Sequence, residues 1–215
     1  MKLITKNLAL ATALAVLAGC ASKSYDKGAA TATALESAAA ATTQTSTRVT
    51  DVLGALNKLT FKSEGDLRKQ YDAFVSASEK LNKSIETLGT KAATMRDAAT
   101  AYSQNWSNQL ATISSEELRA RSTERMNEVT TKLNDMEASY LGVKNSLSPF
   151  TSDLKDIKTY LGTDLTVGGL ASVKDVVSKT KADAVPLRDS IKALQASFSR
   201  LGTALSPMLP VTDKK

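Results

Sequence analysis

Apolar residues recur at alternating intervals of three and four along most of this chain, and no stretch shows the alternation expected of a β-strand. A repeat of 3.5 residues places one narrow apolar stripe, a seam, on a helix, and that seam must be buried against other helices. Four segments carry such a seam: residues 35–59, 67–106, 126–161 and 170–205. The spacing predicts an all-α protein.

Polar breaks separate the first three segments. In the break at residues 61–66, Asp66 or Ser63 is expected to cap the second helix, because their side chains accept hydrogen bonds from free backbone N–H groups. Ser114 and Glu117 have the spacing of a capping box and are expected to begin the third helix.

Glycine and proline complete the division of the chain. Gly162 and a later pair of glycines are expected to separate the third helix from the fourth. Pro149 and Pro186 fall inside continuous seams, so they predict kinks and not ends. Residues 206–207, Ser-Pro, are expected to stop the last helix, followed by a disordered tail over residues 207–215.

Short connections make successive helices antiparallel. The prediction is therefore an elongated antiparallel four-helix bundle with coiled-coil seams, covering residues 34–206. Each middle helix, of about 48 residues, would run ~70 Å at ~1.5 Å per residue, so the middle hairpin is expected to protrude beyond shorter outer helices. The alternative is an oligomer in which another copy completes the seams.

Small side chains occupy part of the seams. Ser78, Ala92 and Ala99 leave shallow positions on the second segment, which predicts that a neighbouring helix approaches closely there. Thr42 and Thr45 lie on the seam of the alanine- and threonine-rich first segment. That segment is the weakest helix by pattern, and it is expected to gain order by packing against the others.

The N-terminus has the three parts of a lipoprotein signal peptide over residues 1–19. Lys2 and Lys6 form a basic start, and an uncharged apolar run follows at residues 8–18, too short to span a membrane. Residues 17–20 read Leu-Ala-Gly-Cys, which looks like a lipobox, the sequence in which the cysteine is acylated before cleavage. The alternative is an ordinary secreted protein with an incidental cysteine.

Cysteine usage supports the lipoprotein interpretation. Cys20 is the only cysteine, so no disulfide can form within the chain, and acylation would remove a free thiol from an oxidising compartment. Residues 20–33 are expected to be the lipidated cysteine and a tether. Because residue 21 is Ala and not Asp, the predicted location is the periplasmic face of the outer membrane, with the inner membrane as the weaker alternative.

Composition excludes several classes of function. After removal of Lys2 and Lys6, 26 basic residues remain against 22 acidic ones, spread evenly, so no nucleic-acid surface is predicted. The chain has no histidine and no cysteine other than Cys20, which excludes the usual zinc, copper and haem ligand sets and the His- or Cys-dependent catalytic triads. No metal and no cofactor are expected.

The chain resembles a family of bacterial lipoproteins known only as a domain of unknown function, over residues 48–205. The resemblance implies an almost wholly helical protein and no assigned activity. It is carried by residues 67–74, Tyr102, Trp106, residues 117–122, Tyr140 and residues 156–161.

One candidate interaction patch lies at the tip of the predicted middle hairpin. Tyr102 and Trp106 are large rings near this tip, although their seam positions favour burial in the core. Arg119, Arg121 and Arg125 follow the turn, but interleaved glutamates favour a solvated face with i,i+4 ion pairs over an anion site. Paired carboxylates elsewhere are expected to be surface residues, so no catalytic residue is predicted.

Three functions follow from these observations, in order of preference. The first is a non-enzymatic, lipid-anchored periplasmic module that acts structurally or binds other envelope proteins or further copies of itself. The second is a carrier or sensor of an apolar or lipid ligand within the bundle. The third, a hydrolase using carboxylates, has no motif to support it.

Overall fold

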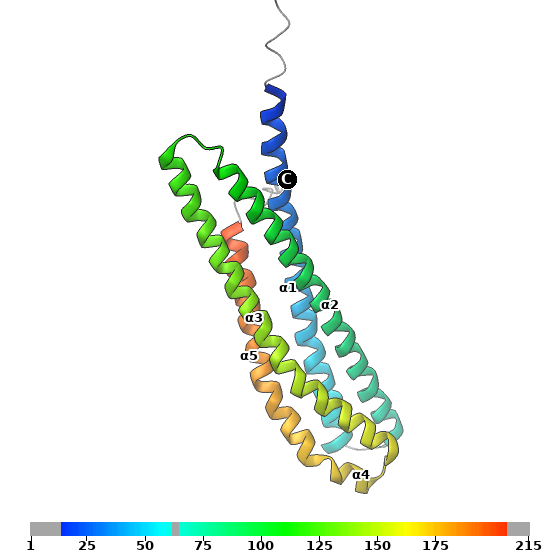
Figure 1. The fold of residues 1–215 in the computed structure, drawn as a ribbon. Coiled ribbons are helices and arrows are strands. Elements are labelled where there is room, and N and C mark those ends of the chain that lie inside the picture. Colours follow the sequence, from blue (N-terminus) through cyan, green and yellow to red (C-terminus); the bar gives the residue numbers. More distant parts are fainter. Residues whose placement is uncertain (1–13, 62–64, 206–215) are drawn as a thin grey trace, which may run out of the picture.

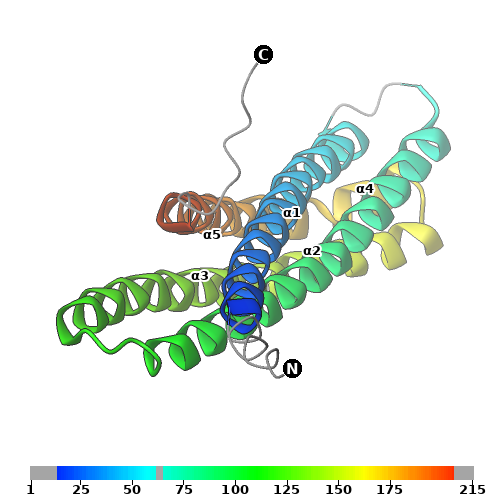
Figure 2. The same ribbon diagram turned by 90° about the horizontal axis from the view of Figure 1, so that it is seen from above.

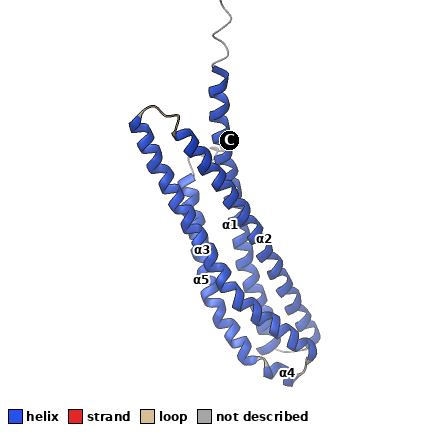
Figure 3. Ribbon diagram, viewed as in Figure 1, coloured by secondary structure: helices blue, strands red, loops and turns tan. Residues whose placement is uncertain are grey.

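Four long helices and one short helix make up the part of the chain that this computed structural model describes, residues 14–61 and 65–205, with side chains described from residue 26 onward. The helices are α1 (Leu14–Phe61), α2 (Leu67–Leu110), α3 (Glu116–Thr163), α4 (Val167–Ser172) and α5 (Lys174–Leu205) (Figure 1). The described residues contain no strand (Figure 3). The predicted all-α, antiparallel four-helix architecture is confirmed.

The long helices form a closed ring in which neighbours along the chain are neighbours in space. α1 contacts α2, α2 contacts α3, α3 contacts α5, and α5 contacts α1, with the closest packing within the pairs α1–α2 and α3–α5 (Figure 2). We call the end with the α2–α3 connection, residues 111–115, the near end, and the end with α4 the far end (Figure 1).

The seams predicted from the sequence line the core. Every residue at the 3–4 spacing from Leu35 to Leu59 is buried, and so is every one from Leu170 to Leu205. The seams of α2 and α3 are mostly buried as well, with Phe74 and Phe150 fully enclosed. All these seams are completed within one chain, because each helix finds its apolar partners in the same ring.

Small residues bring α1 and α2 close together. Thr45 Oγ1 donates to the carbonyl of Ser84 at 3.3 Å, and Thr31 Oγ1 donates to the carbonyl of Ala98 at 3.2 Å. A threonine side chain is short, so these bonds require the two backbones to approach closely. The residues of α2 at these bonds, Ser84 and Ala98, are themselves small, whereas Ser78 and Ala99 line the hollows between α2 and α3.

Serines join α3 to α5 in the same way. The hydroxyls of Ser139 and Ser197 lie 2.9 Å apart, and those of Ser146 and Ser190 lie 3.1 Å apart. Each pair satisfies its polar groups between the helices, which is the condition for burying them at low cost.

The first helix begins earlier than the sequence pattern indicates. α1 already starts at Leu14, and Thr31 and Ala32 are buried, so the tether expected over residues 20–33 is helical and its last residues belong to the bundle. The alanine-rich composition, with its high helix propensity, accounts for this extension. Residues 1–13 of the signal peptide and the tail at 207–215 lie outside the described residues, as does the side chain of Cys20.

With 48 residues, α1 is as long as α3, so the expectation of a short first helix was wrong. Its N-terminal part reaches past the α2–α3 connection at the near end (Figure 1). Among the four long helices, α5 with 32 residues is much shorter than the others. Within the described residues, no helix is both long and apolar enough to cross a membrane.

Of the two predicted helix caps, one is confirmed and one shifts by a residue. Asp66 caps α2 as expected, accepting from the N–H groups of Arg68 and Lys69. At α3, however, Ser115 is the N-cap and accepts from Leu118 N at 3.4 Å, so the expected cap at Ser114 was wrong by one residue. The helices run through both internal prolines.

A short helix replaces the simple glycine turn expected between the last two long helices. Thr166 caps α4 through a hydrogen bond from Gly169 N, 3.0 Å long. A Cβ on Gly169 would lie 2.1 Å from the carbonyl oxygen of Asp164, so only glycine fits here. The glycine pair therefore permits a tight reversal at the far end and does not itself end α3, which continues to Thr163.

Candidate functional site

The two aromatic residues of the predicted tip patch lie inside the near end. Tyr102 is 2% exposed, and Trp106 is partly buried against the core. Their ring centroids are 5.4 Å apart at an interplanar angle of 53°. Trp106 Nε1 donates to Ser122 Oγ at 2.9 Å, which joins α2 to α3. Both rings therefore stabilise the near end from within, as their seam positions favoured.

The hydroxyl of Tyr102 has no hydrogen-bond partner among the described residues. Burial removes water from this group and raises the pKa of Tyr102 to about 12, with a smaller opposing effect from the charge of Arg125. The side chain is thus neutral throughout the physiological range, and its hydroxyl adds a buried polar atom to an otherwise apolar contact.

The three arginines of the predicted patch have different surroundings. Arg125 is half-buried and donates to the carbonyl of Ala204 in the last turn of α5, as well as to Glu128 at 2.9 Å. Arg121 is exposed and pairs with Glu117 at 2.7 Å, and Arg119 is also exposed. The patch therefore divides into an inner group that holds helices together and two arginines on the surface.

Two carboxylates, Asp153 of α3 and Asp183 of α5, share one lysine. Lys179 Nζ lies 2.8 Å from both Asp153 and Asp183, a bridge from α5 to α3. The hydrogen bond with Asp153, followed by that with Asp183, raises the pKa of Lys179 above its ordinary value. Within the described residues, no group of three or more acidic, histidine or cysteine side chains is arranged to hold a metal ion.

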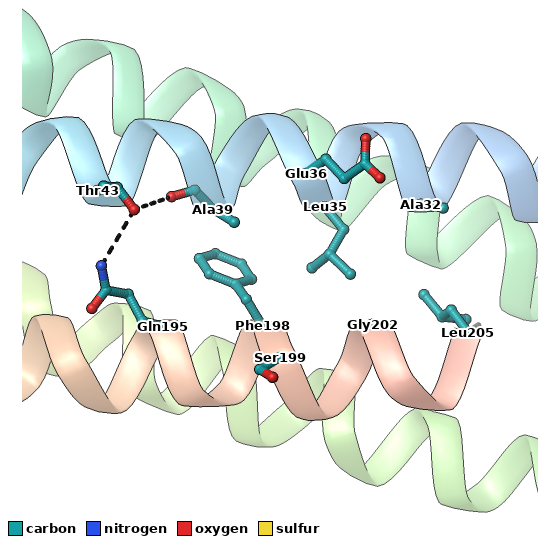
Figure 4. Close-up of a pocket in the computed structure, with 10 residues that line it drawn as sticks. All are labelled: Ala32, Leu35, Glu36, Ala39, Thr43, Gln195, Phe198, Ser199, Gly202 and Leu205. Atoms are coloured by element: carbon teal, nitrogen blue, oxygen red, sulfur yellow. Dashed lines mark hydrogen bonds between the residues drawn. The ribbon is translucent and has the colours of Figure 1, made fainter. Parts of the chain in front are cut away.

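An apolar groove that the sequence analysis did not identify lies between α1 and α5, toward the near end (Figure 4). Its volume is about 380 Å³. Leu35 points into it from α1, and Phe198 points into it from α5 (Figure 4). The lining residues are Ala32, Leu35, Glu36, Ala39, Thr43, Gln195, Phe198, Ser199, Gly202 and Leu205.

Two further hollows lie between α2 and α3. One, of about 320 Å³, is lined in part by Arg96 and Glu137, which form an ion pair across it at 2.7 Å. The other, of about 460 Å³, is lined mainly by hydroxyl, amide and lysine side chains. These three hollows follow the two lines where one closely packed helix pair meets the other, and the lining of the α1–α5 groove includes no basic side chain.

The sequence contained a weak signal for this groove. Ala32 and Ala39 lie seven residues apart beside the seam of the first segment, and Gly202 lies beside the seam of the last. Small residues beside two seams leave a groove only if the two helices place them opposite each other. Their placement depends on the register between the helices, and the sequence does not show that register.

The residues that carry the family resemblance meet in space at both ends of the α2–α3 contact. At the far end, the hydroxyl of Tyr71 donates to the carbonyl of Lys158 at 2.9 Å. At the near end, the Trp106–Ser122 bond joins two more of the matching sites. These pairings place the matching stretches within one helical hairpin.

Comparisons with known proteins identify a family for this chain but no individual relative. No curated protein and no solved structure matches the chain. A family described as "Protein of unknown function (DUF2959)" matches residues 22–202, which covers all of the described bundle except its last turn and the start of α1. The chain therefore belongs to the DUF2959 family.

Proposed function

We propose that this chain is a lipoprotein of the bacterial outer membrane, held at the periplasmic face through an acylated Cys20. Its helical bundle acts as a structural or protein-interaction module of the cell envelope. The lipobox at residues 17–20 and the single cysteine support the anchor. Three acyl chains on that cysteine would hold the protein without a basic surface.

The observation that carries the proposal is the continuity of α1. This helix includes Cys20 near its start and packs into the bundle from Gly28 onward. Eight helical residues span about 12 Å, so the link between an acylated Cys20 and the bundle would be short and stiff. The near end would then face the membrane, and the far end would stand about 70 Å away.

The far end offers a surface to a partner at that distance. Phe61, Tyr160, Val167 and Val176 belong to the helix ends that meet there, and each is between 38% and 79% exposed. Lys181 Nζ lies 4.0 Å from the centre of the Phe61 ring, which leaves a cation beside this apolar surface. Exposed apolar residues gathered at one end favour contact with another protein.

Palmitate labelling with membrane fractionation tests the anchor. The unchanged chain is expected to take up label and to fractionate with the outer membrane, whereas Cys20→Ser should lose both label and membrane association. Ala21→Asp is the matched control, expected to keep the label but remain in the inner membrane. A labelled Cys20→Ser protein would contradict acylation at this residue.

Crosslinking in intact cells tests the interaction role. A photoreactive p-benzoylphenylalanine in place of Val167 is expected to give one adduct of defined mass. The same residue in place of Leu141, which is 47% exposed in the middle of α3, should give none. Equal adducts from both positions, or none from Val167, would count against a partner at the far end.

A further inference from the structure

The α1–α5 groove has the shape of a narrow channel along two helices. It extends on α1 from Ala32 to Thr43, about 16 Å at ~1.5 Å per residue. A further helix, ~10 Å across, is too large for a groove of this length and a volume of about 380 Å³. A single extended chain of methylene groups matches both its length and its volume of about 380 Å³.

The walls of the groove are apolar along its length. Leu35, Phe198 and Leu205 supply the large side chains, and Ala39 and Gly202 keep the space between them open (Figure 4). A Cβ on Gly202 would lie 3.6 Å from Leu35 Cδ2, an ordinary contact distance. A larger side chain at this position would therefore extend into the groove without displacing the helix backbone.

The two ends of the groove differ. Gln195 Nε2 donates to Thr43 Oγ1 at 3.3 Å, and this bond between α5 and α1 closes one end (Figure 4). The other end lies at Leu205, the last residue of α5, on the side where α1 leads to Cys20. A chain lying in the groove would point its apolar end at the Thr43–Gln195 bond and its head group toward the near end.

Charge restricts the head group. The ten lining residues include one carboxylate, Glu36, and no basic side chain. The guanidinium of Arg125 lies beside the open end, at the carbonyl of Ala204, but it is already paired with Glu128. A negatively charged head would find no partner among the ten lining residues and would be repelled by Glu36. We infer that the groove binds one alkyl chain of a single-chain lipid whose head group is uncharged. This site is independent of the anchor at Cys20 and of the partner surface at the far end.

Displacement of a fluorescent probe tests the inference. The probe is N-phenyl-1-naphthylamine, and the protein is the mature chain from residue 20 with Cys20→Ser, which keeps every buried residue of the bundle. 1-Dodecanol is expected to displace the probe, and to bind more tightly than 1-octanol by about fourfold for each added methylene that enters the groove. No displacement by 1-dodecanol would overturn the inference.

Two groove-filling variants locate the binding. Gly202→Leu is expected to weaken probe and dodecanol binding at least tenfold, and Ala39→Phe serves as a second filling variant if the first loses helicity by circular dichroism. Gly54→Leu is the matched control, because Gly54 lies on the exposed face of α1 with nothing within 4 Å of its Cβ position, and it should change binding less than twofold. Equal losses in the control and filling variants would overturn the assignment to this groove.

Comparing dodecanol with dodecanoate tests the head-group charge at constant chain length. Dodecanoate is expected to bind the unchanged groove more weakly than dodecanol. Glu36→Gln should tighten dodecanoate binding about fivefold, as expected for removing a like charge at a solvent-facing rim, and leave dodecanol binding unchanged. Dodecanoate that binds as tightly as dodecanol to the unchanged protein would refute the preference for an uncharged head.

Discussion

Two tyrosines of α2 differ in what their hydroxyl groups contact. The hydroxyl of Tyr71 donates to the carbonyl of Lys158 on α3, whereas that of Tyr102 has no hydrogen-bond partner among the described residues. A buried polar group that makes no hydrogen bond loses its contacts with water without compensation. The two residues therefore form a matched pair for measuring the effect of a single hydroxyl.

Removing each hydroxyl is expected to have opposite effects on stability. Tyr71→Phe should lower the free energy of unfolding by about 1 kcal/mol, because it removes the hydrogen bond that the hydroxyl donates from α2 to α3. Tyr102→Phe should leave the free energy of unfolding unchanged or raise it by up to about 1 kcal/mol. Urea denaturation followed by circular dichroism measures both, and a loss at Tyr102 equal to that at Tyr71 would reveal a hydrogen bond at Tyr102.

The pH dependence of stability should also report Tyr102. Its pKa is raised by burial to about 12 in the folded chain, against an ordinary value of 10.0. Between pH 10 and 12 the folded state therefore holds a proton that the unfolded state has released, so the free energy of unfolding falls as pH rises through this range.

This decrease should be smaller in Tyr102→Phe than in the unchanged protein. The measurement is the urea midpoint at pH 9, 10 and 11, with Tyr71→Phe as the control that retains Tyr102. Burial raises the pKa of Tyr140 too, so part of the decrease will remain in every variant. Identical pH profiles for the Tyr102→Phe variant and the unchanged chain would place the Tyr102 pKa near its ordinary value.

At the scale of elements, an arginine of α3 holds the C-terminal end of α5, the shortest of the four long helices. Arg125 of α3 donates to the carbonyl of Ala204 in the last turn of α5, where carbonyl groups have no partners within the helix and carry partial negative charge. Hydrogen bonds from Lys132 and then Arg125 also hold the pKa of Glu128 below its ordinary value. This contact orients α5 beside the groove.

Replacing Arg125 should therefore loosen the end of α5. Arg125→Gln is expected to lower the free energy of unfolding by about 1–2 kcal/mol and to speed amide hydrogen exchange over residues 200–205. Arg121→Gln is the control, since its exposed pair with Glu117 should contribute less than about 0.5 kcal/mol. Unchanged exchange at the end of α5 would show that the Arg125 contact does not hold it.

Two glycines should respond in opposite ways to the same added methyl group. Gly169→Ala places a Cβ against Asp164 and should destabilise the chain by about 1–3 kcal/mol, because the reversal at α4 must open. Gly54→Ala adds its Cβ to open space in the interior of α1 and should stabilise by up to about 1 kcal/mol through helix propensity. Thermal unfolding of both variants provides the comparison.

Features that depend on one helix alone were predictable from the sequence, and features that depend on how two helices face each other were not. Leu35 to Leu59 are buried at the predicted spacing because a seam is a property of one helix. The cap at Ser115 was missed because Ser114 alone has a glutamate three residues later, whereas Ser115 caps α3 with a leucine at that position. The α1–α5 groove was missed because Ala39 and Gly202 leave space only when the register places them opposite each other.

At the scale of the whole molecule, the bundle consists of two closely packed helix pairs joined along two looser lines. The small residues that draw α1 to α2 and α3 to α5 account for the close pairs. The three hollows lie where the two pairs meet, along the α1–α5 and α2–α3 contacts. Small side chains thus allow close packing within each pair, while space remains between the pairs. Ligand binding in the groove would thus disturb the packing within either helix pair very little.

Closure of the ring has a consequence for assembly. Because all four seams are buried within one chain, the mature protein without acyl groups is expected to sediment as a monomer. Small-angle scattering should give a longest dimension of about 70–90 Å, set by helices of 48 residues at ~1.5 Å per residue. A stable dimer of the same length would instead show side-by-side association through surface residues. A particle much longer than one helix would mean that copies exchange helices, so that the seams were completed between chains.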